Sequence, residues 1–165
     1  MRRFVVLVTG MSGTGKSAAL EELSRRGHRA VDTDDPGWIL EVDTPEGTEP
    51  VWDLDRVGEL VRGHRDGWLF LAGCVANQRA LYDSVDAVVL LSAPLEVVLA
   101  RVAGRVDVFG ATPQDRAKIA SDLATYEPRL RAGADHEVVT TVPTAAVADV
   151  LERIAAGRRR RGCPA

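Results

Sequence analysis

Short apolar runs alternate along the chain with segments in which apolar residues recur every three or four positions. Short runs rich in β-branched residues predict buried strands, whereas the longer spacing predicts amphipathic helices. Strands that alternate with helices are typical of a parallel sheet covered on both faces. We therefore expect a three-layer α/β fold with a five-stranded parallel sheet. Its strands should lie at residues 4–9, 29–31, 68–72, 86–91 and 136–140.

The helical segments fall between these strands. They are expected at residues 18–23, 52–61, 77–82 and 92–103, from residue 113 onward, and after Pro143 to residue 157. Pro128 lies inside the longest helix and should break or kink it near Glu127, because proline lacks the N–H that a helix interior needs.

Two stretches lack a clear period. Residues 38–50 contain three turn-forming residues and are expected to form a loop or a short helix, and residues 104–112 form a Gly-containing excursion. With no internal repeat or domain boundary, residues 1–157 should form one domain, followed by a basic tail at residues 158–165.

The first strand leads into Gly10–Ser17, which reads GMSGTGKS and is followed by helical spacing. Strand, Gly-rich loop and helix form the context in which G-x-x-x-x-G-K-[ST] acts as a phosphate-binding loop. Its glycines allow positive φ, so that backbone N–H groups can point at phosphate oxygens. The expected nucleotide contacts come from Ser12, Gly13, Thr14, Gly15, Lys16 and Ser17.

Two residues of this loop have individual roles. Lys16 should reach the β- and γ-phosphates, and the Ser17 hydroxyl should complete the coordination of Mg²⁺. A chance match in a glycine-rich turn is the alternative, but the flanking strand and helix argue against it. The sequence therefore predicts binding of a nucleoside triphosphate.

Composition limits the class of protein. The 165 residues include 21 Lys and Arg against 24 Asp and Glu, so that no global charge favours nucleic acid or membrane. Two cysteines are too few for a disulfide framework, and no apolar run is long enough for a signal peptide or a membrane span. We expect a soluble cytoplasmic protein without membrane partners. Four arginines at residues 158–161 favour a solvated tail.

Three carboxylates follow the second strand, at Asp32, Asp34 and Asp35. The carboxyl ends of parallel strands form the edge where open α/β sheets bind ligands. Asp34 should aim an acceptor hydroxyl at the γ-phosphate and take its proton. Asp32, two residues earlier on the same face, is better placed for Mg²⁺ and its waters, and Asp35 for capping the next helix.

The chain resembles the small P-loop kinases of metabolites and nucleotides, the group of shikimate, gluconate and adenylate kinases. The resemblance extends over the whole chain, although only the first 17 residues match a specific motif. It implies a P-loop NTPase fold with a short lid at about residues 104–112. It also implies, from the D-x-D pattern, that Asp32 helps to organise Mg²⁺ and that Asp34 holds the acceptor.

The resemblance also points to a helix end that supplies arginines to the lid. Arg101-Val102-Ala103-Gly104-Arg105 is similar to the R-x-x-G-R spacing of adenylate kinases. Arg105 is the expected catalytic arginine over the γ-phosphate. Arg101 could lie against the adenine ring, with Pro143 on its other side, as in the family. The alternative for both arginines is a solvated helix end.

The chain departs from these families at the acceptor side. Gly73 is followed by Cys74-Val75-Ala76 instead of the further glycines of shikimate kinases, and the D-G-[FY]-P-R motif of adenylate kinases is absent. Gly73 still suits a close backbone approach to substrate. Asn77 and Gln78 could bind substrate or cap a helix. Trp38 and Trp52 could stack on substrate or lie in the core, and the core is favoured.

The predicted function is ATP- and Mg²⁺-dependent transfer of the γ-phosphoryl group to a hydroxyl or phosphate of a small-molecule acceptor. A GTP-dependent switch would need an N-K-x-D string, and a transporter ATPase an L-S-G-G-Q string, and the sequence has neither. The remaining alternative is a nucleotide-binding regulatory ATPase without small-molecule transfer activity, in which the arginine tail contacts RNA or a partner protein.

Overall fold

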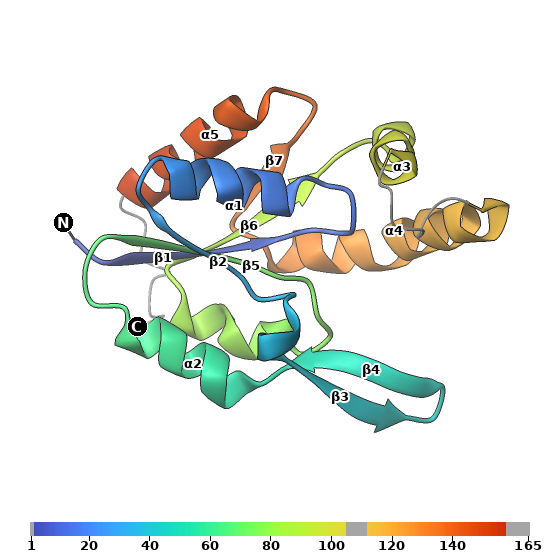
Figure 1. The fold of residues 1–165 in the computed structure, drawn as a ribbon, viewed down its shortest axis with the longest axis horizontal. Coiled ribbons are helices and arrows are strands. Elements are labelled where there is room, and N and C mark those ends of the chain that lie inside the picture. Colours follow the sequence, from blue (N-terminus) through green and yellow to red (C-terminus); the bar gives the residue numbers. More distant parts are fainter. Residues whose placement is uncertain (1, 105–111, 158–165) are drawn as a thin grey trace.

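The computed structural model describes residues 2–104 and 112–157. Five parallel strands form the main sheet, in the order β2-β5-β1-β6-β7 (Figure 1). Their bounds are Phe4–Thr9 for β1, Arg29–Asp32 for β2, Trp68–Ala72 for β5, Ala87–Ser92 for β6 and His136–Val139 for β7. The expected sheet is therefore confirmed. Residues 105–111 of the expected lid, with Arg105, and the basic tail lie outside the described residues.

Helices cover the two faces of the sheet, with α1 and α5 on one face and α2 on the other (Figure 1). Their bounds are Lys16–Arg25 for α1, Leu54–Gly63 for α2, Leu95–Ala103 for α3, Pro113–Gly133 for α4 and Thr144–Ala156 for α5, with short 3₁₀ helices η1 at Pro36–Trp38 and η2 at Gln78–Ser84. None of the helices in residues 2–104 and 112–157 is long and apolar enough to cross a membrane.

The alternation of side chains along the central strand divides the core into two clusters. On β1, Val5 and Leu7 pack with residues of α2, whereas Val6 and Val8 pack with residues of α1 and α5. All four side chains are fully buried. Since both faces are covered, β1 reads as a continuous apolar run, which is why the sequence identifies it so clearly.

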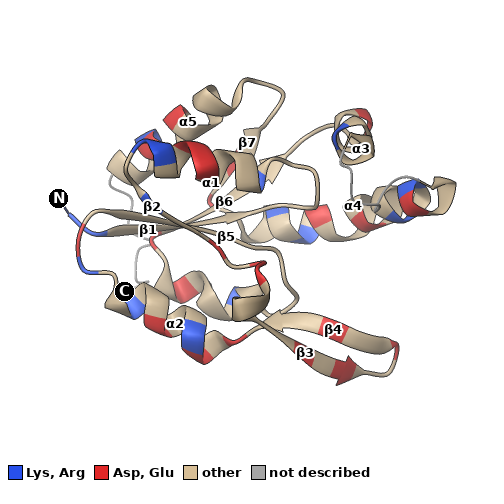
Figure 2. Cartoon of the chain, viewed as in Figure 1, with Lys and Arg blue, Asp and Glu red and all other residues tan. Residues whose placement is uncertain are grey.

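Residues 39–52 form an antiparallel hairpin, so the expected loop or short helix is wrong for this stretch. Its strands are β3 (Ile39–Thr44) and β4 (Gly47–Trp52), and the ribbon projects from the body of the domain (Figure 1). Pro50 is tolerated because both strands of a two-stranded ribbon are edge strands. The hairpin carries acidic and no basic side chains, as Figure 2 shows.

The hairpin is anchored at its second strand. Trp52, the last residue of β4, is 1% exposed and belongs to the core cluster on the α2 face. Asn77 binds the backbone of Trp52 twice, because its Oδ1 accepts from the Trp52 N–H and its Nδ2 donates to the Trp52 carbonyl. This side chain takes the place of a neighbouring strand, 25 residues away along the chain.

Helix α4 continues through Pro128, so the expected break at Glu127 is wrong. Proline deprives the carbonyl of Ala124, four residues earlier, of its helical partner. Ala124 is exposed, so water can satisfy this carbonyl. At the other end, Thr112 and Asp115 form a capping box that fixes the start of the helix.

Candidate functional site

The loop between β1 and α1 has the backbone that its glycines predict. Gly13 and Gly15 have φ values of 82° and 96°, in the left-handed region. A Cβ on Gly13 would also lie 3.0 Å from Val102 and 3.1 Å from Val98, both on α3. Glycine is needed here for its backbone conformation and because α3 packs directly against the loop.

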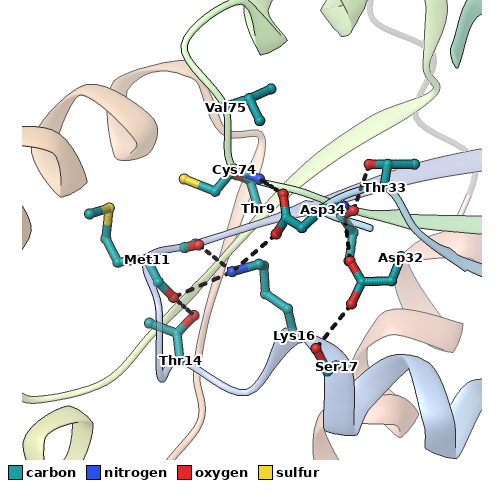
Figure 3. A network of polar contacts seen from close by, with 12 residues as sticks. Thr9, Met11, Thr14, Lys16, Ser17, Asp32, Thr33, Asp34, Cys74 and Val75 are labelled. Carbon is teal, nitrogen blue, oxygen red and sulfur yellow. Dashed lines mark hydrogen bonds and ion pairs between the residues drawn. The ribbon is translucent and has the colours of Figure 1, made fainter. Parts of the chain in front are cut away.

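This loop borders a cavity of about 310 Å³ at the carboxyl ends of β1 and β2. It is lined by Met11, Ser12, Gly13, Gly15, Lys16, Ser17, Asp32, Asp34 and Cys74. The structure thus brings the loop together with both aspartates that follow β2 (Figure 3). Thr14, by contrast, is fully buried, and its hydroxyl donates to the Met11 carbonyl at 2.7 Å.

Lys16 extends across the loop toward the end of β2. Its Nζ donates to the Gly10 carbonyl at 2.7 Å and lies 3.9 Å from Asp34 Oδ2 (Figure 3). The side chain is only 12% exposed, so its charge acts in a partly desolvated site. Lys16 therefore joins the phosphate-binding loop to the acceptor side of the cavity.

The surroundings of Asp34 orient its carboxylate and shift its pKa. Its Oδ1 accepts a hydrogen bond of 3.0 Å from the Cys74 N–H. Burial raises the pKa of the Asp34 carboxyl, while the Lys16 ammonium and this hydrogen bond oppose the rise. A raised pKa brings a carboxylate closer to the range in which it accepts a proton efficiently. Burial also raises the pKa of the Cys74 thiol, which favours its protonated form.

Ser17 and Asp32 offer paired oxygen atoms at the base of α1. Ser17 Oγ donates to Asp32 Oδ2 at 3.0 Å, and Asp32 Oδ1 accepts from the Asp34 N–H at 3.1 Å. Hydroxyl and carboxylate oxygens suit Mg²⁺, which usually takes few protein ligands and completes its shell with water and phosphate oxygens. The described residues contain no cluster of three or more His, Cys, Asp or Glu for a metal. A Mg²⁺ site shared with a nucleotide fits this donor set.

A second cavity, of about 210 Å³, lies on the other side of the loop. Its lining includes Gly13, Gly15, Ala18, Arg101, Thr140, Val142, Thr144 and Val147. Arg101 therefore lies beside the loop. Pro143 precedes α5, and its two neighbours, Val142 and Thr144, line this cavity.

Gly73 is buried behind the first cavity and does not line it. A Cβ on Gly73 would lie 2.5 Å from Trp52 Cζ2 and 2.7 Å from Thr33 Oγ1. The structure thus supplies a packing reason for this glycine. The two tryptophans also have packing contacts, because Trp52 is core and Trp38 packs against the same cluster under the Arg56 guanidinium.

The side chains of Asn77 and Gln78 form hydrogen bonds within the protein. Asn77 binds the backbone of Trp52. Gln78 is 2% exposed, accepts from Thr9 and donates to the Tyr82 hydroxyl. Neither makes the side-chain cap of η2 that the sequence left open. Their amides hold the hairpin and η2 to the sheet.

Two contributors to the site are not evident from the sequence. The backbone N–H of Cys74 orients Asp34, and the hydroxyl of Thr140 reaches the phosphate-binding loop from the end of β7. Both join segments far apart along the chain. For Thr140, the only sequence signal is its position at the end of the last expected strand.

The fold and the phosphate-binding loop define a P-loop protein whose site suits a nucleotide. The sequence profile of the AAA domain family matches residues 6–110, which is more than half of the chain, and the chain belongs to this family. No curated protein sequence matches the chain.

Solved structures share the fold at low sequence identity. A shikimate kinase from Acinetobacter baumannii in complex with shikimate is 18% identical, with a TM-score of 0.65 and 92% of both chains covered. A shikimate kinase from Bacteroides thetaiotaomicron is 12% identical, with a TM-score of 0.61 and 92% and 97% covered. An unliganded sugar kinase from a Janibacter species is 20% identical, with a TM-score of 0.55 and 92% and 93% covered. The chain is thus similar in fold to small P-loop kinases.

Proposed function

We propose that the protein is an ATP-dependent small-molecule kinase that transfers the γ-phosphoryl group to a hydroxyl or phosphate group of its acceptor. The observation that carries this proposal is the placement of Asp34 opposite Lys16, 3.9 Å apart in the cavity beside the phosphate-binding loop. A carboxylate with a raised pKa at this position suits proton transfer from an acceptor hydroxyl, which nucleotide binding alone does not require.

Each side of the cavity has its own task in this proposal. The loop and Lys16 bind the phosphates of ATP, with Lys16 as the positive charge at the β- and γ-phosphates. Asp34 orients the acceptor hydroxyl and takes its proton as the new bond forms. The Cys74 N–H holds the carboxylate in place for this work. For an acceptor that offers a phosphate group, Asp34 would only orient that group, because no hydroxyl proton has to be removed.

Ser17 and Asp32 would hold Mg²⁺, which supplies charge neutralisation between the β- and γ-phosphates when it is bound. In the structure these two side chains bond to each other, and Asp32 also accepts from the Asp34 N–H. The metal and acceptor positions are therefore coupled through one short segment. Asp32→Asn should raise the Mg²⁺ concentration needed for half-maximal activity.

The test is an acceptor screen that measures ATP consumption and ADP formation, repeated with GTP and with ATP alone. The proposal predicts that one class of small-molecule hydroxyl or phosphate compounds raises turnover well above the rate with ATP alone. Lys16→Ala and Ser17→Ala should abolish this turnover without lowering the melting temperature, because both side chains lie at the cavity.

Turnover that no acceptor raises would instead favour the regulatory ATPase. Acceptor-dependent turnover that persists in Lys16→Ala would contradict the proposal outright. Mass spectrometry of the product distinguishes transfer to the acceptor from stimulated hydrolysis, because only transfer adds a phosphoryl group to it.

A further inference from the structure

The phosphate-binding loop is held from outside by two side chains that the chemistry of transfer does not use. Thr140 follows β7 and is 4% exposed, and its hydroxyl lies 2.7 Å from the Thr14 carbonyl. Arg101, near the end of α3, donates to Thr140 Oγ1 at 2.9 Å and to the Gly13 carbonyl at 3.3 Å. A second bond from Arg101 reaches the Thr140 carbonyl.

The Thr140 hydroxyl donates its hydrogen to the Thr14 carbonyl. The Ser92 carbonyl lies 3.3 Å away and already accepts the Thr140 N–H at 2.8 Å, whereas the Thr14 carbonyl is closer. The lone pairs of the hydroxyl are then available to the Arg101 guanidinium, which can only donate. One buried hydroxyl thus joins α3, β7 and the loop.

We propose that Arg101 and Thr140 form a clamp that fixes the phosphate-binding loop in its binding conformation before a nucleotide arrives. The loop needs such a clamp because Gly13 and Gly15 flank Thr14, and glycines allow peptide groups to reorient at little cost. In a planar trans peptide the carbonyl and the following N–H point in opposite directions. Holding the Thr14 carbonyl at Thr140 therefore aims the Gly15 N–H away from Thr140.

The neighbouring peptide shows the same arrangement. The Gly13 carbonyl faces Arg101, and the following Thr14 N–H donates to the Met11 carbonyl at 3.3 Å, within the loop. Arg101 and Thr140 thus fix the orientation of two consecutive peptide groups. The Thr14 N–H is thereby used inside the loop, and the Gly15 N–H is the donor that the clamp preorganises for an anion, which avoids a further ordering cost on binding.

This proposal assigns Arg101 a different task from stacking on the adenine ring. It rests on the proposed nucleotide-binding function of the loop but not on transfer to any acceptor. A clamp affects every ligand that uses the loop, whereas a stacking residue affects only ligands that carry a base. Magnesium tripolyphosphate, which has phosphates and no base, separates the two.

The experiment is isothermal titration of the full chain with Mg-ATP and with magnesium tripolyphosphate. Arg101→Met and Thr140→Val should each lower the affinity for both ligands by a similar factor of about tenfold, as expected when a buried hydrogen bond loses one partner. Thr140→Ser keeps the hydroxyl and should restore most of the affinity.

Arg3→Met is the matched control for Arg101→Met. Arg3 also donates to two backbone carbonyls, those of Val61 and His64, and pairs with Asp86, but it lies directly before β1, at the opposite end of the strand from the loop. Its removal should lower the melting temperature and leave both affinities unchanged.

Three results with the variants would overturn the clamp. They are a loss of affinity confined to ATP, unchanged affinity for both ligands in Arg101→Met and Thr140→Val, and an equal loss in Arg3→Met. A wild-type protein that binds ATP but not tripolyphosphate would also overturn it, because the base would then carry the affinity. A wild-type protein that binds neither ligand would overturn the proposed function together with the clamp.

Discussion

Gly73→Ala tests whether this glycine is required by packing. The added Cβ would lie 2.5 Å from Trp52 Cζ2 and 2.7 Å from Thr33 Oγ1, both closer than a Cβ approaches other heavy atoms in proteins. Trp52 cannot readily move aside, because it is 1% exposed and its indole N–H donates to the Thr33 carbonyl at 3.1 Å. Overpacking of a rigid core costs about 1–3 kcal/mol, and this geometry favours the upper half of that range.

For a chain of this size, each kcal/mol lowers the melting temperature by about 2–4 °C, so Gly73→Ala should lower it by about 4–12 °C. Differential scanning calorimetry measures the shift. Gly63→Ala is the matched control, since Gly63 is exposed on α2 and a Cβ there would meet no atom within 4 Å. That variant should be neutral or more stable by up to about 1 kcal/mol.

A double-mutant cycle with Trp52→Phe identifies the cause. Phenylalanine lacks the Cζ2 atom that the new Cβ would meet, so Gly73→Ala should cost less in the Trp52→Phe protein than in the wild type, and the cost that remains comes from Thr33 Oγ1. An unchanged melting temperature in Gly73→Ala would refute the packing argument, and the same cost in both backgrounds would show that Trp52 is not the cause. Lost acceptor-dependent activity with full stability would instead support the contact with substrate that the sequence predicts.

Three further predictions concern charged groups. In a plot of kcat against pH, the acid limb should lie above the usual range of an aspartate, because burial raises the pKa of Asp34. Asp34→Asn should remove this limb and lower kcat about 10²-fold, while ATP still binds. Arg105→Ala should lower kcat with little change in the Kd for ATP, as measured by single-turnover kinetics and titration. Hydrogen bonds from Arg131 and Ser92 lower the pKa of Glu137 to about 2, so its carboxylate stabilises the fold above pH 4.5. In urea titrations, the stability advantage of the wild type over Glu137→Gln should shrink as the pH falls from 4.5 toward 2, and an advantage that does not change with pH would contradict this assignment.

Much of the fold could be predicted from the sequence because its main signals are local. A fully buried strand such as β1 is apolar at every position, and the glycines of the following loop are required by their own backbone conformation. The two aspartates after β2 needed only the topology of a parallel sheet to be placed beside this loop. Each of these inferences depends on residues that are adjacent along the chain or on a general rule of parallel sheets.

The parts that could not be predicted depend on contacts between distant segments. The β3–β4 hairpin contains turn-forming residues, and its anchor is the side chain of Asn77 bound to the backbone of Trp52, 25 residues away. Thr140 reaches Thr14 across 126 residues. The helix through Pro128 is a different case, because there the exposure of one carbonyl, which the sequence does not reveal, decides whether proline is tolerated.

The site consists of two halves that different elements hold, and this division has a consequence for the proposed function. Thr140 and Arg101 hold the loop from the side of β7 and α3. Asp34 is held from the side of β5, where the backbone N–H of Cys74 donates a hydrogen bond to its carboxylate. Lys16 spans both halves, through its contacts with the Gly10 carbonyl and Asp34, and Ser17 joins them through Asp32. Changes at Thr140 or Arg101 should therefore alter the affinity for phosphate ligands, changes at Asp34 should alter the rate of transfer, and changes at Lys16 should alter both.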